Sequence, residues 1–311
     1  MKIGIDILGG DYAPNEALKG IEEYLKEGRA GIVMIGDEEK TAPLLKNYLL
    51  PEDAYRMVHA PEVIDMHDSP TRALKEKKRS SIAVGFHLLA QGEIDAFISA
   101  GNTGAMLVGA LYALKTVEGV LRPTISTIIP KENGGTGLLL DVGLNSDCKP
   151  EHLNQFAIMG SVYAQNILGI ENPRVGLINI GEEEGKGNLL AQATYPLLKE
   201  NGHINFVGNV EGRDVFLDKA DVMVCDGFTG NIMLKLAESL FEITQRKQIH
   251  HEYLDRFNFE NYGGTPVLGV SKPVIIGHGI SKAKAFRNMI ELAQKMIEKD
   301  VLEKSHIELV S

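Results

Sequence analysis

The sequence predicts an α/β protein with a mostly parallel sheet, and three observations carry this prediction. Apolar runs alternate with segments of helical periodicity along all 311 residues. Most of these runs are unbroken and rich in β-branched residues, which is typical of strands covered by helices on both faces. Three glycine-rich corners follow a strand and precede a helix. We therefore expect a three-layer α/β/α, Rossmann-like fold with right-handed crossovers, in a single domain over residues 1–311.

Ten apolar runs are expected to form strands. They cover residues 2–8, 31–36, 55–60, 94–100, 124–130, 137–143, 174–180, 204–209, 221–227 and 273–279. Only a short turn around residues 133–135 separates the fifth run from the sixth. We therefore expect one antiparallel hairpin within the sheet.

Helical segments lie between the strands. Residues 14–28 begin with Pro and end with Gly, as helices often do. Residues 150–169 also begin with Pro and end with Gly. Residues 281–302 are expected to form one long amphipathic helix. In residues 231–254 an apolar stripe recurs at helical spacing, formed by Ile232, Leu236, Leu240 and Ile243. It indicates either a surface that lies on a membrane or a face buried in the core or against a partner.

Composition narrows the function classes. The net charge is −10, which disfavours nucleic-acid binding because such binding needs an excess of cations on one face. Two cysteines exclude a disulfide framework and indicate an intracellular protein. The first apolar run contains Asp6 and is expected to be a strand, not a signal peptide. The apolar stretch 104–114 falls short of the roughly 20 residues that cross a bilayer, so we expect a cytoplasmic protein.

The three corners are the segments 99–105, 179–188 and 225–231, which combine Gly with Asn, Thr, Asp or Lys. Glycine allows a sharp turn and close approach to a ligand. The backbone N–H groups and the dipole at a helix start favour an anion. One such corner alone is ordinarily a capped loop, but three on one sheet predict an enzyme that binds phosphate.

Several known signatures are absent. There is no G-x-G-x-x-G after the first strand, and residues 181–187 do not form a Walker loop, since Lys186 lacks a following Ser or Thr. Neither G-x-S-x-G nor H-E-x-x-H occurs. We expect no metal and no cofactor. Asp6, Asp141 and Asp226 lie at strand ends, where such side chains more usually cap helices and accept hydrogen bonds from backbone groups, with a magnesium site as the alternative.

The two cysteines also raise the question of covalent catalysis. Cys225, with His152 or His278 as its base, would form an acyl-accepting pair. Cys225 nevertheless lies inside an apolar run, as a small buried side chain does. Cys148 is followed by Lys149, a neighbour that lowers a thiol pKa, yet we expect Cys148 to be structural.

A family resemblance rests on eight segments in order along the chain. They are 6–14, 99–105, 138–164, 174–188, 206–214, 221–235, 262–270 and 274–286. In these segments the chain resembles the bacterial phosphate acyltransferases of phospholipid synthesis, which make acyl phosphate from acyl-acyl-carrier protein and inorganic phosphate. Leu144 and Ser146 depart from the family pattern, while four neighbouring residues keep it: Asn145, Asp147, Cys148 and Lys149.

The resemblance implies a fold similar to the isopropylmalate dehydrogenase and phosphotransacetylase architectures. It implies a homodimer that associates peripherally with the membrane. It further implies that the acyl phosphate passes to a membrane glycerol-3-phosphate acyltransferase.

Phosphorolysis of a thioester requires that a site orient a charged phosphate and stabilise an oxyanion. From residue type and corner placement we assign catalysis to Lys186, Asn102, Asp226 and Asn231. Substrate binding is assigned to Gly10, Asp11, Thr103, Gly104, Asn145, Lys149, Thr229 and Gly230. His152 is a candidate proton donor to the leaving thiol, with helix capping as its alternative. Glu182, Glu183 and Glu184 are expected to pair with Lys186 and Arg213 or to face a partner subunit.

The acidic carrier protein requires cations at its docking surface. The run 72–79 supplies Arg72, Lys75, Lys77, Lys78 and Arg79, and a second run supplies Lys282, Lys284 and Arg287. Such runs are often only solvated helix faces.

Three alternatives remain beside this assignment. The first is a phosphotransacetylase-like enzyme that uses acyl-coenzyme A. The second is a noncatalytic scaffold, which would not need three anion-binding corners. The third is a hydroxyacid dehydrogenase, which the missing dinucleotide fingerprint does not support.

Overall fold

The computed structural model describes residues 1–310, which fall into two units, each discontinuous in sequence. Unit 1 comprises Met1–Lys115 and Phe259–Glu298. Unit 2 comprises Thr116–Asn258 and the segment from Lys299 onward. Each unit contains its own run of paired strands and is described by itself.

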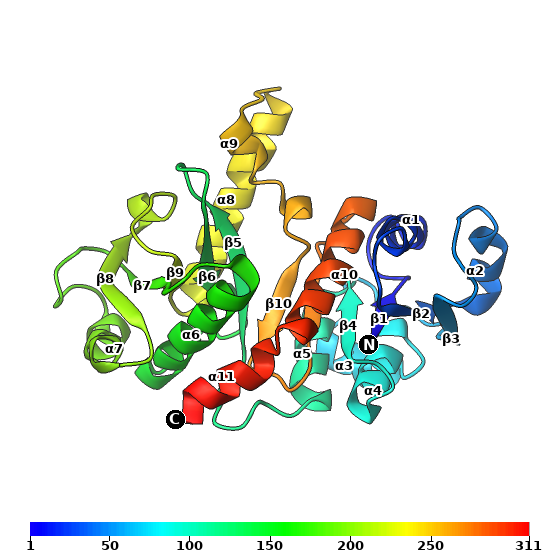
Figure 1. Ribbon diagram of the computed structural model, residues 1–311, viewed down its shortest axis with the longest axis horizontal. Helices are drawn as coiled ribbons and strands as arrows, with labels where there is room; N and C mark the ends of the chain where they lie inside the picture. Colours follow the sequence, from blue (N-terminus) through cyan, green and yellow to red (C-terminus); the bar gives the residue numbers. More distant parts are fainter. Residues whose placement is uncertain (311) are drawn as a thin grey trace. The chain divides into compact units, whose positions relative to one another are not determined.

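The strands of unit 1 are paired in the order β3-β2-β1-β4-β11-β10 (Figure 1). Their bounds are β1 (Lys2–Asp6), β2 (Gly31–Gly36), β3 (Tyr55–His59), β4 (Ala96–Ser99), β10 (Thr265–Leu268) and β11 (Val274–Ile276). The pair β10–β11 is antiparallel, and the other pairs of this unit are parallel. Ile3, Ile5 and Phe97 are fully buried, as expected for strands covered on both faces.

Helices lie on both faces of these strands (Figure 1). They are α1 (Asn15–Leu25), α2 (Glu38–Leu45), α3 (Pro70–Glu76), α4 (Ser81–Gln91), α5 (Thr103–Ala113), α10 (Ala283–Glu298) and the short 3₁₀ helix η3 (Phe259–Asn261). Helix α10 packs against α1 and against β1, β4 and β11, while α4 contacts β1, β2 and β4. Unit 1 is therefore a helix–sheet–helix sandwich.

The strands of unit 2 are paired in the order β5-β6-β9-β7-β8. Their bounds are β5 (Thr124–Pro130), β6 (Thr136–Leu140), β7 (Arg174–Asn179), β8 (Asn205–Glu211) and β9 (Val222–Val224). The pair β5–β6 is the expected antiparallel hairpin, and the other pairs are parallel. The parallel neighbours β6, β9 and β7 bring the loops after their carboxyl ends to one edge of the sheet.

The helices of unit 2 are α6 (Pro150–Tyr163), α7 (Leu189–Glu200), α8 (Gly227–Arg246), α9 (Glu252–Asp255) and α11 (Val301–Val310). Helix α6 continues as the π-helix η1 (Ala164–Leu168), and η2 (Gly212–Asp214) is a 3₁₀ turn. Helix α6 contacts β6, β7, β9 and α11, and α8 contacts β6. Figure 1 shows α6 and α8 on opposite sides of these strands. The predicted α/β class, with mostly parallel pairing and helices on both faces, is confirmed.

Two predicted elements differ from the structure. The expected helix 281–302 ends at Glu298, because Asp300 adopts a left-handed conformation with φ of 50° that no helix can continue through. A separate helix, α11, begins at Val301. Strand β10 was not predicted. It is only four residues long and contains Pro266, which weakens its strand pattern.

Several strands are shorter than predicted, and for β6 and β9 the reason is that the chain turns early at the candidate site. Strand β6 ends at Leu140, and the following Asp141 binds backbone N–H groups of its own loop. Strand β9 ends at Val224, and Asp226 already caps α8. Both endings place a carboxylate at the carboxyl edge of the unit 2 sheet.

The apolar stripe of α8 is exposed. Ile232, Leu236, Leu240 and Ile243 are between 44% and 62% exposed. The stripe is therefore not part of the core of unit 2. Among the described residues, no helix combines the length and apolar character that a membrane crossing requires.

Candidate active site

The first turn of α8 lies directly on the loop after β6. A Cβ atom on Gly230 would overlap the carbonyl oxygen of Asp141, so only glycine permits this approach. The Gly227 N–H donates to the carbonyl of Asn145 at 2.7 Å. The predicted 225–231 corner and the predicted substrate-binding residue Asn145 are thus in contact.

Asp141 organises the loop beneath that turn. Its buried carboxylate accepts hydrogen bonds from the backbone N–H groups of Gly143 and Leu144 at 3.0 Å and of Asn145 at 2.7 Å. The Asn145 side-chain amide donates to the same carboxylate and to the carbonyl of Pro123. Burial raises the pKa of Asp141, although these hydrogen bonds oppose the shift. The expectation from the sequence that Asp141 accepts hydrogen bonds from backbone groups is confirmed.

Three predicted side chains are gathered at the start of α8. Asp226 caps the helix, accepting from the Thr229 backbone N–H at 2.9 Å and from the Thr229 hydroxyl at 2.8 Å. The Asn231 amide donates to the carbonyl of Val142 at 3.2 Å and is exposed. The helix N-terminus, with its partial positive charge, faces the loop that Asp141 holds.

Two cations flank this loop. Lys149 is the N-cap residue of α6, its side chain is exposed, and no described carboxylate forms an ion pair with it. Arg122 donates from Nη1 to the carbonyl of Asp147 at 3.2 Å and is also exposed. Arg122 was missed by sequence reasoning, because it precedes a predicted strand and belongs to no motif.

His152 is a helix-capping residue. It is 7% exposed, and its Nδ1 accepts from the Lys149 backbone N–H at 3.1 Å. Burial and the nearby charges of Arg122 and Lys149 lower its pKa. A neutral ring with Nδ1 as acceptor carries its proton on Nε2. Two roles were left open for His152, proton donation to the leaving thiol and helix capping, and the hydrogen bond to Lys149 directly supports capping.

Neither cysteine has the environment of an activated thiolate. Burial, with the charges of Asp141 and Asp226, raises the pKa of Cys148 to about 12. Burial raises the pKa of Cys225 well above its usual value. Nucleophilic cysteines have lowered thiol pKa values, so the structure argues against the covalent alternative.

Lys186 lies in the loop after β7, at the same sheet edge. The loop is held by hydrogen bonds from Asn179 Nδ2 to the Lys186 carbonyl at 3.1 Å and from Asn209 Nδ2 to the Glu183 carbonyl at 2.9 Å. The Lys186 ammonium lies 3.9 Å from Glu183, and its side chain is 52% exposed. Among the described residues, no hydrogen bond or ion pair joins Lys186 to the first turn of α8.

The other glutamates of this loop have different partners from those expected. Glu182 pairs with Lys219 at 2.7 Å, and Glu184 pairs with Lys199 at 3.0 Å. Arg213, expected to pair with this loop, instead contacts Glu211. Of the ion pairs expected for this loop, only the one between Glu183 and Lys186 is formed.

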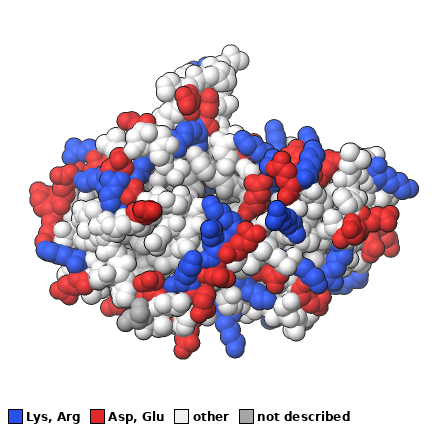
Figure 2. Space-filling model, viewed as in Figure 1, with Lys and Arg blue, Asp and Glu red and all other residues white. Residues whose placement is uncertain are grey.

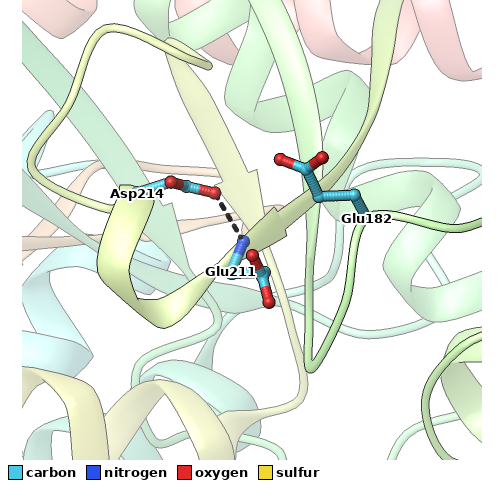
Figure 3. Close-up of side chains that lie close together, drawn as sticks. All are labelled: Glu182, Glu211 and Asp214. Carbon is cyan, nitrogen blue, oxygen red and sulfur yellow. Dashed lines mark hydrogen bonds between the residues drawn. The ribbon is translucent and has the colours of Figure 1, made fainter.

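One cluster of carboxylates has metal-like spacing. Oxygen atoms of Glu182, Glu211 and Asp214 lie within 4.8 Å of one another, with Asp214 accepting from the Glu211 backbone N–H (Figure 3). Lys219 also lies 3.0 Å from Asp214, and Arg213 neutralises Glu211. Lys219 and Arg213 thus already pair with all three carboxylates, and the cluster is explained as an ion-pair network.

In unit 1 the loop after β1 carries Gly10 and Asp11. Gly10 has φ of 99°, and a Cβ there would lie 3.0 Å from the carbonyl of Gly279. The Asp11 N–H donates to that carbonyl at 2.8 Å. The loops after β1 and β11 are therefore joined, and Asp11 is left with an exposed side chain.

The loop after β4 is tied to β1 through a buried pair. Ser99 donates its hydroxyl to Asp6 at 2.7 Å and accepts from the Gly101 N–H at 2.9 Å. Burial raises the pKa of Asp6. Both residues act in positioning the 99–105 corner, and Ser99 was missed by sequence reasoning.

Asn102 is fully engaged with protein groups. Its Oδ1 accepts from the Ala105 N–H at 2.9 Å, and its amide nitrogen donates to the carbonyl of Asp65 at 2.8 Å and that of Asp68 at 3.2 Å. It is 4% exposed. The side chain thus caps α5 and fixes the 65–68 loop. Next to it Thr103 is exposed, and Gly104 packs against Pro70.

Only some of the cations in the predicted docking run lack an ion-pair partner among the described residues. Arg72 pairs with Glu76 at 3.0 Å, and Lys77 pairs with Asp68 at 2.6 Å and with Asp65. Lys75, Lys78 and Arg79 are exposed, and none forms an ion pair with another described residue. Figure 2 shows basic and acidic side chains interspersed over the face in view.

Comparisons with known proteins match nearly the whole chain. The model of a family described as "Fatty acid synthesis protein" matches residues 1–304. The chain is 45% identical to the phosphate acyltransferase of Dictyoglomus turgidum, over 98% of this chain and 96% of that protein. It is 44% identical to the phosphate acyltransferase of Aquifex aeolicus, over 96% and 94% of the two chains.

Solved structures support the fold. A phosphotransacetylase from Streptococcus pyogenes matches with a TM-score of 0.68 and 19% identity, over 96% of this chain and 94% of that one. A branched-chain phosphotransacylase from Enterococcus faecalis matches with a TM-score of 0.60 and 16% identity, over 95% and 99%. The expected likeness to the phosphotransacetylase architecture is confirmed. The chain belongs to the phosphate acyltransferase family and is an enzyme of acyl transfer with phosphate.

Proposed function

We propose that this enzyme transfers the acyl group of an acyl-acyl-carrier-protein thioester to inorganic phosphate. The product, an acyl phosphate, would supply a membrane glycerol-3-phosphate acyltransferase in phospholipid synthesis. The family relationship supports the use of phosphate. The observation that carries the site is the contact between α8 and the Asp141 loop, with two exposed cations beside it.

Phosphate is already an anionic nucleophile at neutral pH, so the site has to position it more than deprotonate it. The α8 N-terminus supplies a partial positive charge, and Lys149 and Arg122 supply full ones. Lys186 follows a neighbouring strand at the same edge. We assign phosphate binding to this set.

The thioester carbonyl becomes an oxyanion during attack and requires hydrogen-bond donors. Our candidate is Asn231 in the first turn of α8, whose side-chain amide has a second N–H besides the one that donates to Val142, since the backbone N–H groups of Thr229 and Gly230 already donate to Asp226. Asp141 and Asn145 hold the loop below. Asp226 positions Thr229. In unit 1, Gly10, Asp11, Thr103 and Gly104 remain candidates for substrate binding, and Asn102 positions the loop beside them.

The partners are proposed as well. We assign carrier-protein docking to the free cations Lys75, Lys78 and Arg79. The exposed stripe of α8 would meet a second subunit of a homodimer or the surface of a membrane. Peripheral association with the membrane would place the acyl phosphate near the membrane acyltransferase that uses it.

The decisive experiment supplies palmitoyl-acyl-carrier protein and phosphate and traps acyl phosphate as a hydroxamate. A parallel reaction contains palmitoyl-coenzyme A, the donor of the second candidate function. Faster turnover with the carrier protein supports the proposal. Equal or faster turnover with coenzyme A would favour the phosphotransacetylase-like alternative.

A further inference from the structure

Unit 2 contains an apolar pocket of about 130 Å³ beside the second half of α8. Helix α9, which lies against α8 (Figure 1), forms another wall. Its apolar lining consists of Phe216, Leu240, Phe241, Leu254 and Phe257. No residue of this α8–α9 pocket belongs to the candidate active site described above.

The walls of the α8–α9 pocket are held in place by contacts outside it. The Tyr253 hydroxyl donates to the carbonyl of Pro130 at 3.2 Å, which ties α9 to strand β5. The ring of Phe257 packs edge-on against Phe216, with centroids 5.3 Å apart, and against Tyr253 at 5.4 Å. These contacts keep the aromatic walls apart from α8, so the pocket is preformed.

The chemistry of the lining selects an alkyl group. Of its three polar residues, Thr244 donates its hydroxyl to the Phe241 carbonyl at 2.7 Å, and Tyr253 donates to Pro130. The third, Glu132, carries an exposed carboxylate, which disfavours an anion. The pocket is smaller than the roughly 300–1,000 Å³ of sites that enclose a whole small ligand, so it fits one end of a longer apolar molecule.

An exposed apolar track leads from the candidate active site to this pocket. Ile232, Leu236 and Leu240 follow one another at a spacing of four residues, and so lie along one side of α8. They are 53%, 62% and 46% exposed. Leu240 belongs both to this track and to the lining of the pocket. The track therefore begins one turn after the start of α8 and ends at the pocket.

The distance along α8 matches the length of a fatty acyl chain. At 1.5 Å per residue, Leu240 lies about 15 Å and Thr244 about 21 Å along the helix from Gly230. An extended carbon chain advances about 1.25 Å per bond, so a palmitoyl chain spans about 19 Å and an octanoyl chain about 9 Å. A palmitoyl chain whose carbonyl lies at the first turn of α8 would end in the pocket, whereas an octanoyl chain would stop short of Leu240.

We propose that the α8–α9 pocket binds the methyl end of the substrate's acyl chain and thereby selects long chains. The chain would run along Leu236 and Leu240, and its last methylenes would lie among Phe216, Phe241 and Phe257. Burial of this apolar surface is favourable in proportion to the area removed from water. The inference rests on the proposed function, which places the thioester carbonyl at the first turn of α8.

The kinetic test compares palmitoyl- and octanoyl-acyl-carrier protein as donors to phosphate and measures the ratio of their kcat/KM values. We expect a ratio of at least about tenfold in favour of palmitoyl, since each buried methylene is worth roughly fourfold. Thr244→Phe fills the pocket and is expected to lower this ratio by about tenfold, the loss of roughly two buried methylenes. Thr244→Leu, a smaller block, should lower the ratio less.

Ser239→Phe is the matched control. Like Thr244, Ser239 lies on α8 and donates its hydroxyl to the carbonyl three residues earlier, that of Leu236, but it does not line the pocket. It should keep the wild-type ratio. Sedimentation and liposome flotation of Thr244→Phe are measured beside the kinetics, because a second copy of the chain or a membrane is the other possible occupant of an apolar pocket.

A binding measurement separates the pocket from the reaction. Palmitate and octanoate are each titrated into the full-length protein without phosphate, and the methyl NMR signals of Leu240 and Leu254 are followed. We expect saturable shifts with palmitate and none with octanoate. If neither carrier thioester is turned over, the proposed function fails, while saturable palmitate shifts still support the pocket. The inference is overturned if palmitate gives no such shifts, if Thr244→Phe keeps the wild-type ratio, or if it changes only sedimentation or flotation.

Discussion

The backbone carbonyl oxygen of Asp141 occupies the position that a side chain on Gly230 would need, so no side chain fits there between α8 and the loop after β6. This contact fixes the helix N-terminus over the backbone groups that Asp141 holds. Because the two residues follow neighbouring parallel strands, the contact joins the predicted 225–231 corner to the loop after β6.

Gly230→Ala is therefore expected to lower both stability and turnover. Alanine favours a helix over glycine by about 1 kcal/mol, but the overlap with a backbone oxygen costs about 1–3 kcal/mol and can be relieved only by moving α8. Urea unfolding and hydroxamate formation measure the two effects. Gly212→Ala is the control, since nothing lies within 4 Å of a Cβ there. Wild-type turnover in Gly230→Ala would refute the assigned role of this contact.

Lys186→Ala is expected to lower turnover by about 10²-fold and to leave the fold intact, if this ammonium orients the phosphate. Steady-state rates at varied phosphate and circular dichroism check the two parts. Lys199→Ala is the control, because Lys199 pairs with Glu184 of the same loop. Unchanged turnover in the Lys186 variant would remove it from the mechanism.

The buried ion pair of unit 2 predicts a pH-dependent stability. Burial alone would raise the pKa of Asp221, but hydrogen bonds from Arg174 and from Lys131, which is 2% exposed, lower it well below its usual range. A lowered folded-state pKa stabilises the protein above the unfolded value of about 3.9, and this stabilisation is lost as the pH falls below it. Asp221→Asn is expected to cost up to about 3 kcal/mol at pH 7, because the buried Lys131 then keeps only the half-exposed Asp218 as a carboxylate partner.

Urea unfolding at pH 7 and near pH 3 measures this effect. The difference between Asp221→Asn and wild type should shrink at the lower pH. Glu93→Gln breaks an exposed pair with Arg56 and should cost less than about 1 kcal/mol at either pH. A difference for Asp221→Asn that does not change with pH would contradict the assignment.

Charge reversal at Lys78 tests the docking surface. Lys78→Glu is expected to raise the KM for acyl-carrier protein several-fold and to reduce the salt dependence of KM, since opposite charges steer association. Lys77 is less suitable, because its ammonium holds Asp65 and Asp68. Lys26→Glu, an exposed change on α1, is the control. Equal KM values for Lys78→Glu and wild type would exclude this residue from docking.

Leu240→Glu tests the exposed stripe of α8. If the stripe lies on a membrane, this variant should float less with liposomes, because a charge replaces apolar area at the interface. Gln245→Glu adds the same charge off the stripe and should float as the wild type does. Sedimentation of both variants reports on the proposed dimer. Undiminished flotation of a dimeric Leu240→Glu would show that the stripe is not the membrane contact.

The sequence predicted the strands well where burial on both faces makes a run continuously apolar, as in β1 and β4. The prediction was wrong where a single backbone angle ends a helix, as at Asp300. It also missed β10, a strand that is short and contains proline. Such features have no periodic signal.

The site was predictable only in part. Asp226, Thr229 and Asn231 adjoin one another in sequence, so a corner motif brings them together. Asn102 looked equally suitable for catalysis. Its actual partner, the Asp65 carbonyl, lies 37 residues away along the chain, and no local pattern reveals it.

The division of the chain into units has a consequence for how the protein is made. Unit 1 needs β10, β11 and α10, which are translated only after residues 116–258. Its first strands therefore leave the ribosome with a sheet edge unpaired, while most of unit 2 is synthesised. At about 5–20 residues per second, that wait lasts on the order of ten seconds, a period in which chaperones would find the nascent chain exposed.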